Sequence, residues 1–308
     1  MDGILVADKP AGPTSHDVVA LVRRLAATKR VGHGGTLDPF ASGVLPLFLG
    51  RATRVVEYHL GDRKRYRATV CFGASSTTDD LEGELTPSDT PPPDREAVEV
   101  ALEPFRGSIL QRPPAYSAIK VAGRRAYAMA RAGAAVELAP REVTIHRLEL
   151  VSWDGSDPSR PIAVLDVDCS AGTYVRSLAR DVGEATGNAA YLGALVRTAS
   201  GPFTLDGAQP IDRVREAAAD GPGALAALLL PIDAGLEALP EVVLDPAGVT
   251  AVSRGQFVRA TLPPGAADAP IRVRDATGRL VAIATVRDGR LAPDKVLVDP
   301  APPRGADA

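Results

Sequence analysis

The chain combines segments in which hydrophobic and polar residues alternate with segments in which hydrophobic residues recur at helical spacing. Alternation is the pattern of a half-buried strand, and helical spacing is that of an amphipathic helix. In chain order, the pattern predicts a strand at 3–8, a helix from Thr14 or Ser15 to Leu25, a strand at 66–72, a helix at 97–105, strands at 143–151 and 162–169, and a helix at 173–184. Residues 74–94 are acidic and rich in turn formers, so we expect an exposed excursion there.

The last part of the chain has a different pattern, which begins near Leu239 and Pro240. Short β-type segments separated by proline and glycine turns follow at 241–244, 256–260, 271–275, 280–286 and 295–298. We therefore expect a first domain at 1–238 and a small β-rich domain at 239–308, with a frayed end from Pro300 onward.

The most distinctive segment is 31–45, which reads VGHGGTLDPFASGVL and leads into the apolar run 44–49. Its glycines let the backbone turn sharply, and Pro39 pushes Asp38 away from the helical conformation. The pattern predicts a rigid loop that presents a carboxylate, Asp38, and an imidazole, His33, on a core-anchored scaffold. For this segment taken alone, the alternative is an Asp-Pro turn in which the aspartate bonds its own backbone.

Charge is unevenly distributed along the 308 residues, although the net charge is −3. Residues 1–70 carry eleven Lys and Arg against six Asp and Glu, and residues 111–150 carry seven against three. Residues 71–110 carry two against nine, and residues 151–240 carry six against twelve. A fold that brings the two basic blocks together would form a positive cleft on a negative body, which suits a phosphate-rich ligand; solvated faces are the alternative.

Several functional classes lack their sequence marks. Hydrophobic and charged fractions of 45% and 24% are those of an ordinary globular protein, and the sequence predicts neither a signal peptide nor a membrane span. Cys71 and Cys169 have no partner at metal-ligand spacing, so we expect two buried free thiols in a cytoplasmic protein. Because there is no P-loop, dinucleotide-binding glycine motif or His/Cys cluster, we expect no nucleotide or metal cofactor.

Four further blocks accompany the segment at 31–45. They lie at 5–17, 62–68, 111–127 and 169–183. In this order, the five blocks resemble those of the bacterial tRNA pseudouridine-55 synthase family, the TruB family, whose loop reads G-H-T-G-T-L-D-P-x-A-S/T-G-x-L. The chain departs from that pattern at Gly34, where the family usually has threonine.

The resemblance implies an α+β fold with a mixed, mainly antiparallel central sheet flanked by helices (the pseudouridine synthase fold) and a small PUA-like C-terminal domain. It implies a catalytic domain at 1–238, with an RNA-binding insertion at about 111–140, and an RNA-binding domain at 239–308. The implied activity is isomerisation of uridine 55 in the T loop of tRNA, by base flipping and without a cofactor. The implied protein is a monomer with tRNA as its partner and no obligatory protein partner, and it could also assist tRNA folding.

Three catalytic residues follow from the resemblance: Asp38, Tyr66 and Arg176. Asp38 matches the essential carboxylate, which either adds covalently or deprotonates C2′ of the ribose. A pocket would favour protonation of a lone aspartate, so Arg176 is expected to pair with Asp38 and keep it ionised. Tyr66 would stack on the uracil, and its hydroxyl could relay a proton.

Other residues match substrate-binding positions of the family. His33 resembles the histidine that stacks in the RNA loop near the flipped base. Lys9 and Pro10 match a block that shapes the pocket, although Lys9 could equally hold the fold together. Leu195 falls near an apolar pocket position. Phosphate contacts are expected from basic side chains in the block at 111–127 and just after it: Arg112, Lys120, Arg124, Arg125 and Arg131.

Two other classes of protein share parts of this pattern. An RNA-binding chaperone that remodels tRNA needs loop insertion and base flipping but no chemistry, and it would not need Asp38, Tyr66 and Arg176 together. An RNA-guided relative that works inside a ribonucleoprotein would be expected to carry a lysine-rich N-terminal extension, and the N-terminal residues here are of mixed character. The sequence therefore favours a stand-alone enzyme.

Overall fold

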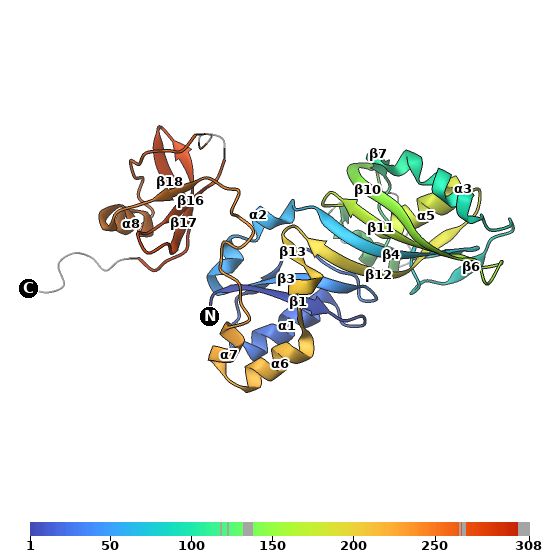
Figure 1. Cartoon of the computed structure of the whole chain (residues 1–308), viewed down its shortest axis with the longest axis horizontal. Coiled ribbons are helices and arrows are strands. Elements are labelled where there is room, and N and C mark those ends of the chain that lie inside the picture. Colours follow the sequence, from blue (N-terminus) through green and yellow to red (C-terminus); the bar gives the residue numbers. More distant parts are fainter. Residues whose placement is uncertain (118, 122, 132–137, 265, 267–268, 301–308) are drawn as a thin grey trace, which may run out of the picture.

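The computed structural model describes residues 1–117, 119–121, 123–131, 138–264, 266 and 269–300. Its centre is a mixed, mainly antiparallel sheet with the strand order β14-β1-β3-β12-β4-β11-β10-β7, to which β2 and β13 add at β3 and β12 (Figure 1). The strands are β1 (Gly3–Lys9), β2 (Val31–His33), β3 (Ser42–Leu49), β4 (Lys64–Phe72), β7 (Gly107–Gln111), β10 (Arg141–Asp154), β11 (Ile162–Cys169), β12 (Ala190–Ser200), β13 (Phe203–Thr204) and β14 (Gln209–Pro210).

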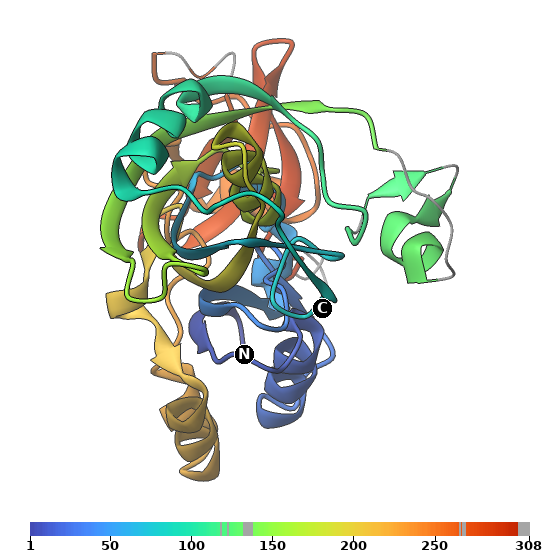
Figure 2. The ribbon, with the colours of Figure 1, turned by 90° about the vertical axis from the view of Figure 1, so that its right-hand side faces the viewer.

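Helices flank this sheet, with α1, α6 and α7 gathered at one end and α3 and α5 at the other (Figure 1). The helices of this part are α1 (Ser15–Leu25), α2 (Glu57–Leu60), α3 (Arg95–Ala101), α4 (Ala126–Arg131), α5 (Val175–Ala185), α6 (Ile211–Ala219) and α7 (Pro222–Ala226), with 3-10 helices η1 (Gly50–Arg54), η2 (Glu103–Phe105) and η3 (Leu205–Gly207). Two hairpins complete it, β5 (Ala74–Ser76) with β6 (Leu85–Pro87) and β8 (Lys120–Val121) with β9 (Arg124–Arg125). Figure 2 shows β8, β9 and α4 standing away from the sheet.

Strand β3 is buried on both of its faces, which explains the unbroken apolar run that follows Asp38. Leu45 and Leu47 pack in a core that includes side chains of α1 and α5, whereas Val44 and Phe48 face a second core. The second core also contains three side chains from the C-terminal part of the chain: Leu280, Ile283 and Leu297. Two cores therefore anchor the strand next to the Asp38 loop, a name used below for residues 34–41.

The C-terminal part forms a separate four-stranded sheet with its own apolar cluster. Its elements are β15 (Glu241–Val243), α8 (Pro246–Ser253), β16 (Ile271–Arg274), β17 (Leu280–Arg287) and β18 (Arg290–Val296). Figure 1 shows this small domain at one end of the molecule. The predicted α+β fold with a small β-rich C-terminal domain is thus confirmed.

Polar contacts also join this domain to the main sheet. Lys295 Nζ lies 2.8 Å from Glu57 Oε1 in α2, and the Tyr58 hydroxyl lies 3.2 Å from Asp294 Oδ2. Exposed ion pairs of this kind contribute about 0–1 kcal/mol each. The shared apolar core therefore supplies most of the free energy that holds the domain in place.

One predicted strand of the C-terminal domain is wrong, and another is displaced, since only Lys295 and Val296 of the segment at 295–298 belong to a strand. Residues 256–260 form an isolated bridge, Val258 with Leu291, and no strand; the last strand is β18, which ends at Val296. Helix α8 is a further difference from the predicted pattern. Its start is marked by Asp245, whose carboxylate accepts the N–H of Gly248, followed by a proline at the first helical position. An Asp-Pro pair is equally typical of a turn between strands, which is how the pattern misleads here.

The predicted elements of the main domain are present, with shifted ends. Thr14 caps α1 in a capping box with Asp17, and the alternating segments are β4, β10 and β11. The prediction that 74–94 is simply an exposed excursion is wrong at Asp80, which is only 3% exposed. The two thiols also differ, because Cys169 is buried but Cys71 is half-buried.

Two glycines with similar backbone angles test how tightly β3 joins β12. A Cβ on Gly43 (φ +102°) would lie 2.3 Å from the carbonyl oxygen of Arg197, whereas a Cβ on Gly12 (φ +108°) would meet nothing within 4 Å. We expect Gly12→Ala to lower the free energy of unfolding by about 1–2 kcal/mol through backbone strain. Gly43→Ala should lower it by about 3 kcal/mol or more, because the strand must also move. Urea unfolding measures both, and equal losses would contradict this account.

Candidate active site

The Asp38 loop is held by the opening segment of the chain. The hydroxyl of Ser15, the first residue of α1, accepts the N–H of Leu37 at 2.8 Å and donates to the Leu37 carbonyl at 3.0 Å. The N–H of Gly12 donates to the carbonyl of Pro39 at 2.8 Å. These bonds fix the backbone on either side of Asp38, so its carboxylate starts from a defined position.

Arg176, in the first turn of α5, faces Asp38 as the sequence predicted. Its Nε lies 3.0 Å from Oδ2 of Asp38, and its Nη2 lies 3.4 Å from Oδ1. The Arg176 side chain is 7% exposed, but that of Asp38 is 35% exposed. The protein therefore encloses the guanidinium while the carboxylate stays open to solvent, where a substrate can reach it.

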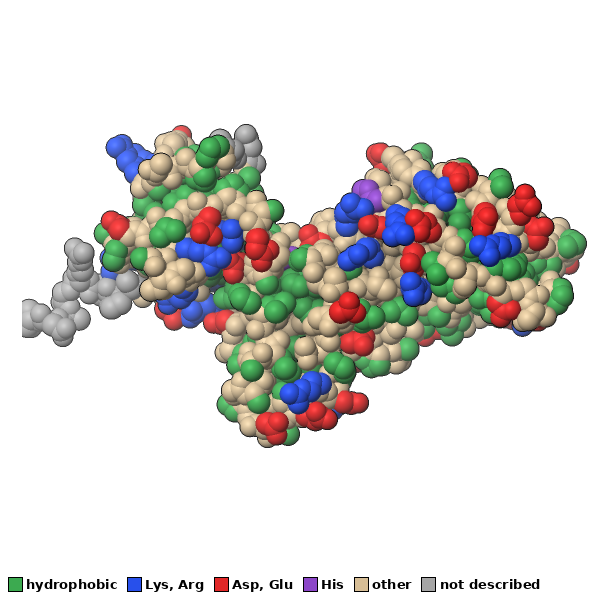
Figure 3. Space-filling model, in the orientation of Figure 1, with side chains coloured by type: hydrophobic (Ala, Val, Ile, Leu, Met, Phe, Trp, Pro, Cys, Tyr) green, Lys and Arg blue, Asp and Glu red, His purple; other side chains and the backbone are tan. Residues whose placement is uncertain are grey.

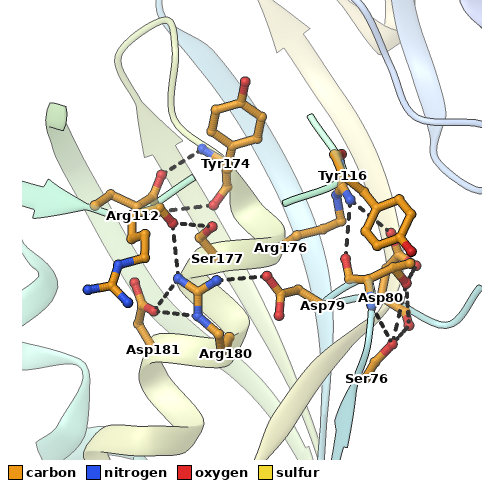
Figure 4. Close-up of polar contacts among 12 residues, drawn as sticks. Ser76, Asp79, Asp80, Arg112, Tyr116, Tyr174, Arg176, Ser177, Arg180 and Asp181 are labelled. Carbon is orange, nitrogen blue, oxygen red and sulfur yellow. Dashed lines mark hydrogen bonds and ion pairs between the residues drawn. The ribbon is translucent and has the colours of Figure 1, made fainter. Parts of the chain in front are cut away.

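Arg176 also binds groups from two other segments (Figure 4). Its Nη1 lies 3.3 Å from Oδ2 of Asp80 and donates to the carbonyl of Thr78 at 3.2 Å. Its Nη2 donates to the carbonyl of Tyr116 at 3.0 Å. One buried cation thus joins the Asp38 loop, the turn after β5, the segment before β8 and helix α5.

The turn after β5 binds two successive arginines on one face of α5. Asp80 pairs with Arg176, and Asp79 Oδ2 lies 2.7 Å from Nη1 of Arg180, one helical turn further along (Figure 4). Sequence reasoning missed both carboxylates. The sequence did contain a signal for them. Arg176 and Arg180 are four residues apart and so lie on one face of a helix, where two adjacent aspartates can each reach one of them.

The start of α5 is fixed by Gln111 at the end of β7. Its side-chain oxygen accepts the N–H of Tyr174 at 2.8 Å, and its side-chain nitrogen donates to the Tyr174 carbonyl at 3.0 Å. The next residue, Arg112, accepts the Ser177 hydroxyl at 2.8 Å through its carbonyl. Since Arg176 lies between Tyr174 and Ser177, its backbone cannot shift without breaking these hydrogen bonds.

Burial raises the pKa of Asp38 above its ordinary value of 3.8, with a further rise from the charge of Asp80. The charge of Arg176 and its hydrogen bond oppose that rise. The pairing therefore acts in the direction that the sequence predicted, but it does not cancel the effect of burial.

Tyr66, Leu195 and Arg197 meet where β4 pairs with β12. Tyr66 lies opposite Arg197, and Ala68 lies opposite Leu195, so these four residues share one face of the sheet. Leu195 is buried, and Tyr66 is half-buried against the main core. Burial raises the pKa of the Tyr66 hydroxyl, while Arg197 lowers it and Asp38 raises it further. Tyr66 is thus within electrostatic reach of Asp38.

Arg197 is a third residue that sequence reasoning missed. Its side chain is buried, and it donates to three carbonyls around Asp38: Val44 (2.7 Å from Nε), Thr36 (3.2 Å from Nη1) and Gly35 (3.1 Å from Nη2). An arginine at an inward-facing position of an otherwise apolar strand was the available signal.

His33 is a neutral ring beside the loop. Its Nδ1 accepts the N–H of Gly35 at 3.3 Å, and burial, followed by the nearby charges of His16 and Arg197, lowers its pKa. The rings of His33 and His16 meet edge to face, with centroids 5.7 Å apart. At Gly34, a Cβ would lie 3.1 Å from Cε2 of Phe48, so a threonine there would require that ring to give way.

Lys9 is completely buried and holds the loop from within. Its Nζ donates to the carbonyls of Pro10 (2.8 Å), Pro13 (2.8 Å) and Pro39 (3.1 Å). Pro10 itself is exposed. The ammonium therefore uses its three N–H groups on the backbone, although its pKa still responds to Asp38, whose charge opposes the lowering that burial causes.

Of the five predicted phosphate contacts, the structure describes the side chain of Arg112. Arg112 is exposed, and Figure 4 shows its carbonyl engaged with α5 while its side chain makes none of the drawn contacts. The side chains of Lys120, Arg124, Arg125 and Arg131 lie outside what the structure describes.

Part of the first basic block lies on the face of the sheet opposite Tyr66. There, Arg63 pairs with Asp168 at 2.7 Å and Arg67 pairs with Asp166 at 2.9 Å. Figure 3 shows blue and red side chains interspersed over β4, β10 and β11. These arginines are therefore neutralised by carboxylates of the neighbouring strand and do not add to a cleft around Asp38.

Within the described residues, no group of three or more His, Cys, Asp and Glu side chains could hold a metal ion. No helix among these residues is both long enough and apolar enough to cross a membrane.

Comparison with protein families matches the chain along nearly its whole length. Residues 23–175 match the TruB family pseudouridylate synthase (N terminal domain). Residues 176–237 match the tRNA pseudouridylate synthase B C-terminal domain, and residues 240–297 match the pseudouridine synthase II TruB, C-terminal.

Curated relatives and a solved structure agree with these matches. A protein of Bradyrhizobium diazoefficiens named tRNA pseudouridine synthase B is 44% identical over 96% of this chain and 85% of its own length. One of the same name from Bacillus licheniformis is 42% identical over 96% and 98%. A chain from the "Crystal Structure of a Cbf5-Nop10-Gar1 Complex" is 27% identical, with a TM-score of 0.73 over 96% of this chain and 85% of that chain.

Two substitutions around the same arginine should have opposite effects on stability. Because burial raises the pKa of Asp38, the folded state favours its protonated form, and that contribution to stability is present at low pH and lost as pH rises. At neutral pH, Asp38→Asn should leave the free energy of unfolding unchanged or raise it by no more than about 1 kcal/mol, since the side chain is partly exposed. Asp80→Asn should lower it by about 3 kcal/mol, because it breaks a buried ion pair. Chemical denaturation at neutral pH measures both, and a large loss from Asp38→Asn would contradict the prediction.

Proposed function

Because the chain belongs to the TruB family of pseudouridine synthases, we propose that it converts uridine 55 in the T loop of tRNA to pseudouridine, with Asp38 as the essential carboxylate. It is an isomerase that acts on tRNA. The observation that carries the assignment of Asp38 is its pairing with the buried Arg176 while its own side chain remains 35% exposed.

The reaction rearranges one base without adding or removing atoms. The N1–C1′ bond breaks, the ring turns, C5 bonds to C1′, and the proton lost from C5 is balanced by one gained at N1. This isomerisation needs no oxidant, reductant or nucleotide. It needs a carboxylate at the sugar, a surface that holds the detached ring, and a group that accepts the C5 proton.

Asp38 is suited to the step at the sugar. Whether it attacks C1′ or takes a proton from C2′, it must be ionised, and Arg176 favours the ionised form. The two Asp38–Arg176 contacts also fix the direction of the carboxylate, which matters because a displacement of about 1 Å can cost 10²-fold in rate.

The sheet face beside Asp38 is suited to hold the uracil. Tyr66 offers an aromatic surface for stacking, and Leu195 offers an apolar wall. A uridine inside a folded T loop must leave its stack to reach Asp38. The neutral ring of His33, just before the Asp38 loop, stacks in the space that the flipped base leaves, and its bond to the Gly35 N–H supports this role by fixing the ring.

The remaining parts of the proposal concern the RNA outside the active site. We assign residues 1–238 to catalysis, with residues 111–140 as an RNA-binding insertion, and residues 239–308 to a second RNA contact. Figure 2 shows β8, β9 and α4, which belong to this insertion, projecting from the sheet. Lys9 and Pro10 shape the pocket, and Arg112, Lys120, Arg124 and Arg125 contact phosphates. The protein acts as a cytoplasmic monomer.

Release of tritium from [5-³H]uridine in a T-arm transcript tests the proposed reaction. We expect the wild-type protein to release tritium and Asp38→Asn to lower the rate by on the order of 10³-fold or more, because the amide can neither attack nor accept a proton. Asp38→Glu keeps the charge but moves it, so it should also be slow.

A matched control keeps the RNA the same and changes only the target base. A transcript with cytidine at position 55 should bind but release nothing. Binding of the wild-type transcript by Asp38→Asn shows that the RNA interface is intact. If wild-type protein binds the transcript and releases no tritium, the synthase assignment fails and an RNA chaperone replaces it.

The pH dependence of single-turnover rates tests the electrostatics of Asp38. Activity requires the ionised carboxylate, and burial raises its pKa, so the acid limb of the profile should lie above the ordinary value of 3.8. Asp80→Asn removes a negative charge that raises this pKa, and it should move the limb to lower pH. A limb that stays in place in Asp80→Asn would contradict this assignment.

A further inference from the structure

The side chain of Arg197 has more hydrogen-bonding capacity than its backbone contacts use. A guanidinium has five N–H donors and no acceptor. The three carbonyls of Val44, Thr36 and Gly35 take Nε–H and one N–H on each terminal nitrogen. One N–H on each terminal nitrogen therefore remains for other partners.

No carboxylate forms an ion pair with Arg197 among the described residues, although this residue is only 1% exposed. Burying a cation without an anion is costly, and burial lowers the pKa of Arg197. The charge itself therefore needs a reason.

Tyr66 supplies that reason. It lies directly opposite Arg197 in the antiparallel pairing of β4 and β12. Arg197 also acts on this hydroxyl electrostatically, because its charge opposes the rise in the pKa of Tyr66 that burial causes. The two side chains therefore share one face of the sheet at a directly paired position, and the guanidinium has N–H groups left to donate.

The donor inventory fixes the direction of any hydrogen bond between these two side chains. Since the guanidinium can only donate, the Tyr66 oxygen must accept, and the hydroxyl hydrogen must point away from Arg197. We propose that Arg197 is a positioning residue for catalysis: it holds the Tyr66 oxygen as an acceptor and so directs the hydroxyl hydrogen toward the uracil bound beside Asp38. This inference rests on the proposed function.

A double-mutant cycle separates this role from simple support of the Asp38 loop. Arg197→Lys keeps a cation but loses the planar guanidinium, whose five N–H groups can bind three carbonyls and Tyr66 at the same time. We expect it to lower the single-turnover rate of pseudouridine formation by about tenfold or more when Tyr66 is present, and by less than about twofold in Tyr66→Phe. The concentration of protein that gives half-maximal rate should stay the same.

Arg23→Lys is the matched control for loop support. Arg23 Nη2 donates to the carbonyl of Val31, in the strand that leads into the Asp38 loop, and its residue is exposed on α1, away from the pairing of β4 with β12. The substitution should change the rate by the same small factor whether it is made in the wild-type protein or in Tyr66→Phe. Thermal unfolding and tRNA binding of each variant show whether it is folded.

Each outcome decides between the alternatives. Equal factors for Arg197→Lys in both backgrounds would overturn the proposal and leave Arg197 as a support for the loop. Should Arg197→Lys fail to fold, Arg197→Gln, which keeps donors without the charge, takes its place in the same cycle. If wild-type protein forms no pseudouridine, the proposed function fails first, and that result is distinct from equal factors in an active enzyme.

Discussion

The structure depends most on one buried cation, the guanidinium of Arg176. It contacts Asp38, Asp80 and two carbonyls, so four segments that are distant in the sequence converge on a single side chain. A buried cation of this kind is stable only while its partners stay in place. The requirement therefore works in both directions: the segments hold Arg176, and Arg176 holds the Asp38 carboxylate at a defined distance.

A second guanidinium, that of Arg197, lies on the sheet side of the Asp38 loop, and the two are partnered in different ways. Arg176 is neutralised by carboxylates, whereas Arg197 is solvated by backbone carbonyls. The first arrangement keeps a cation beside the Asp38 carboxyl group, and the second leaves positive charge beside Tyr66. The acidic and aromatic groups of the site thus have separate electrostatic environments although they belong to one pocket.

Most elements of the main domain and the loop around Asp38 could be predicted from the sequence, because they depend on local patterns. The capping box at Thr14, the alternation in β4 and β11, and the glycines around Asp38 each depend on neighbours in the chain. Asp80 and Arg197 could not be assigned in the same way. Their neighbours offer a signal, an adjacent aspartate for Asp80 and an apolar strand for Arg197, but their roles come from contacts with residues about 100 or more positions away, which no local pattern identifies. The misassigned segment at 256–260 failed for a related reason, since alternation alone does not supply a pairing partner.

The way β3 is buried connects the active site to the C-terminal domain. Its residues alternate between a core under α1 and α5 and a second core that includes Leu280, Ile283 and Leu297. The Asp38 loop continues directly into this strand, and the backbone of Gly43 approaches β12 too closely to admit a side chain. Removing the C-terminal domain would therefore expose Phe48 and loosen the strand that carries the loop, in addition to removing any RNA contact. For this reason, a loss of activity on truncation would not by itself show that the C-terminal domain binds RNA; measuring unfolding of the truncated chain alongside its tRNA affinity separates the two effects.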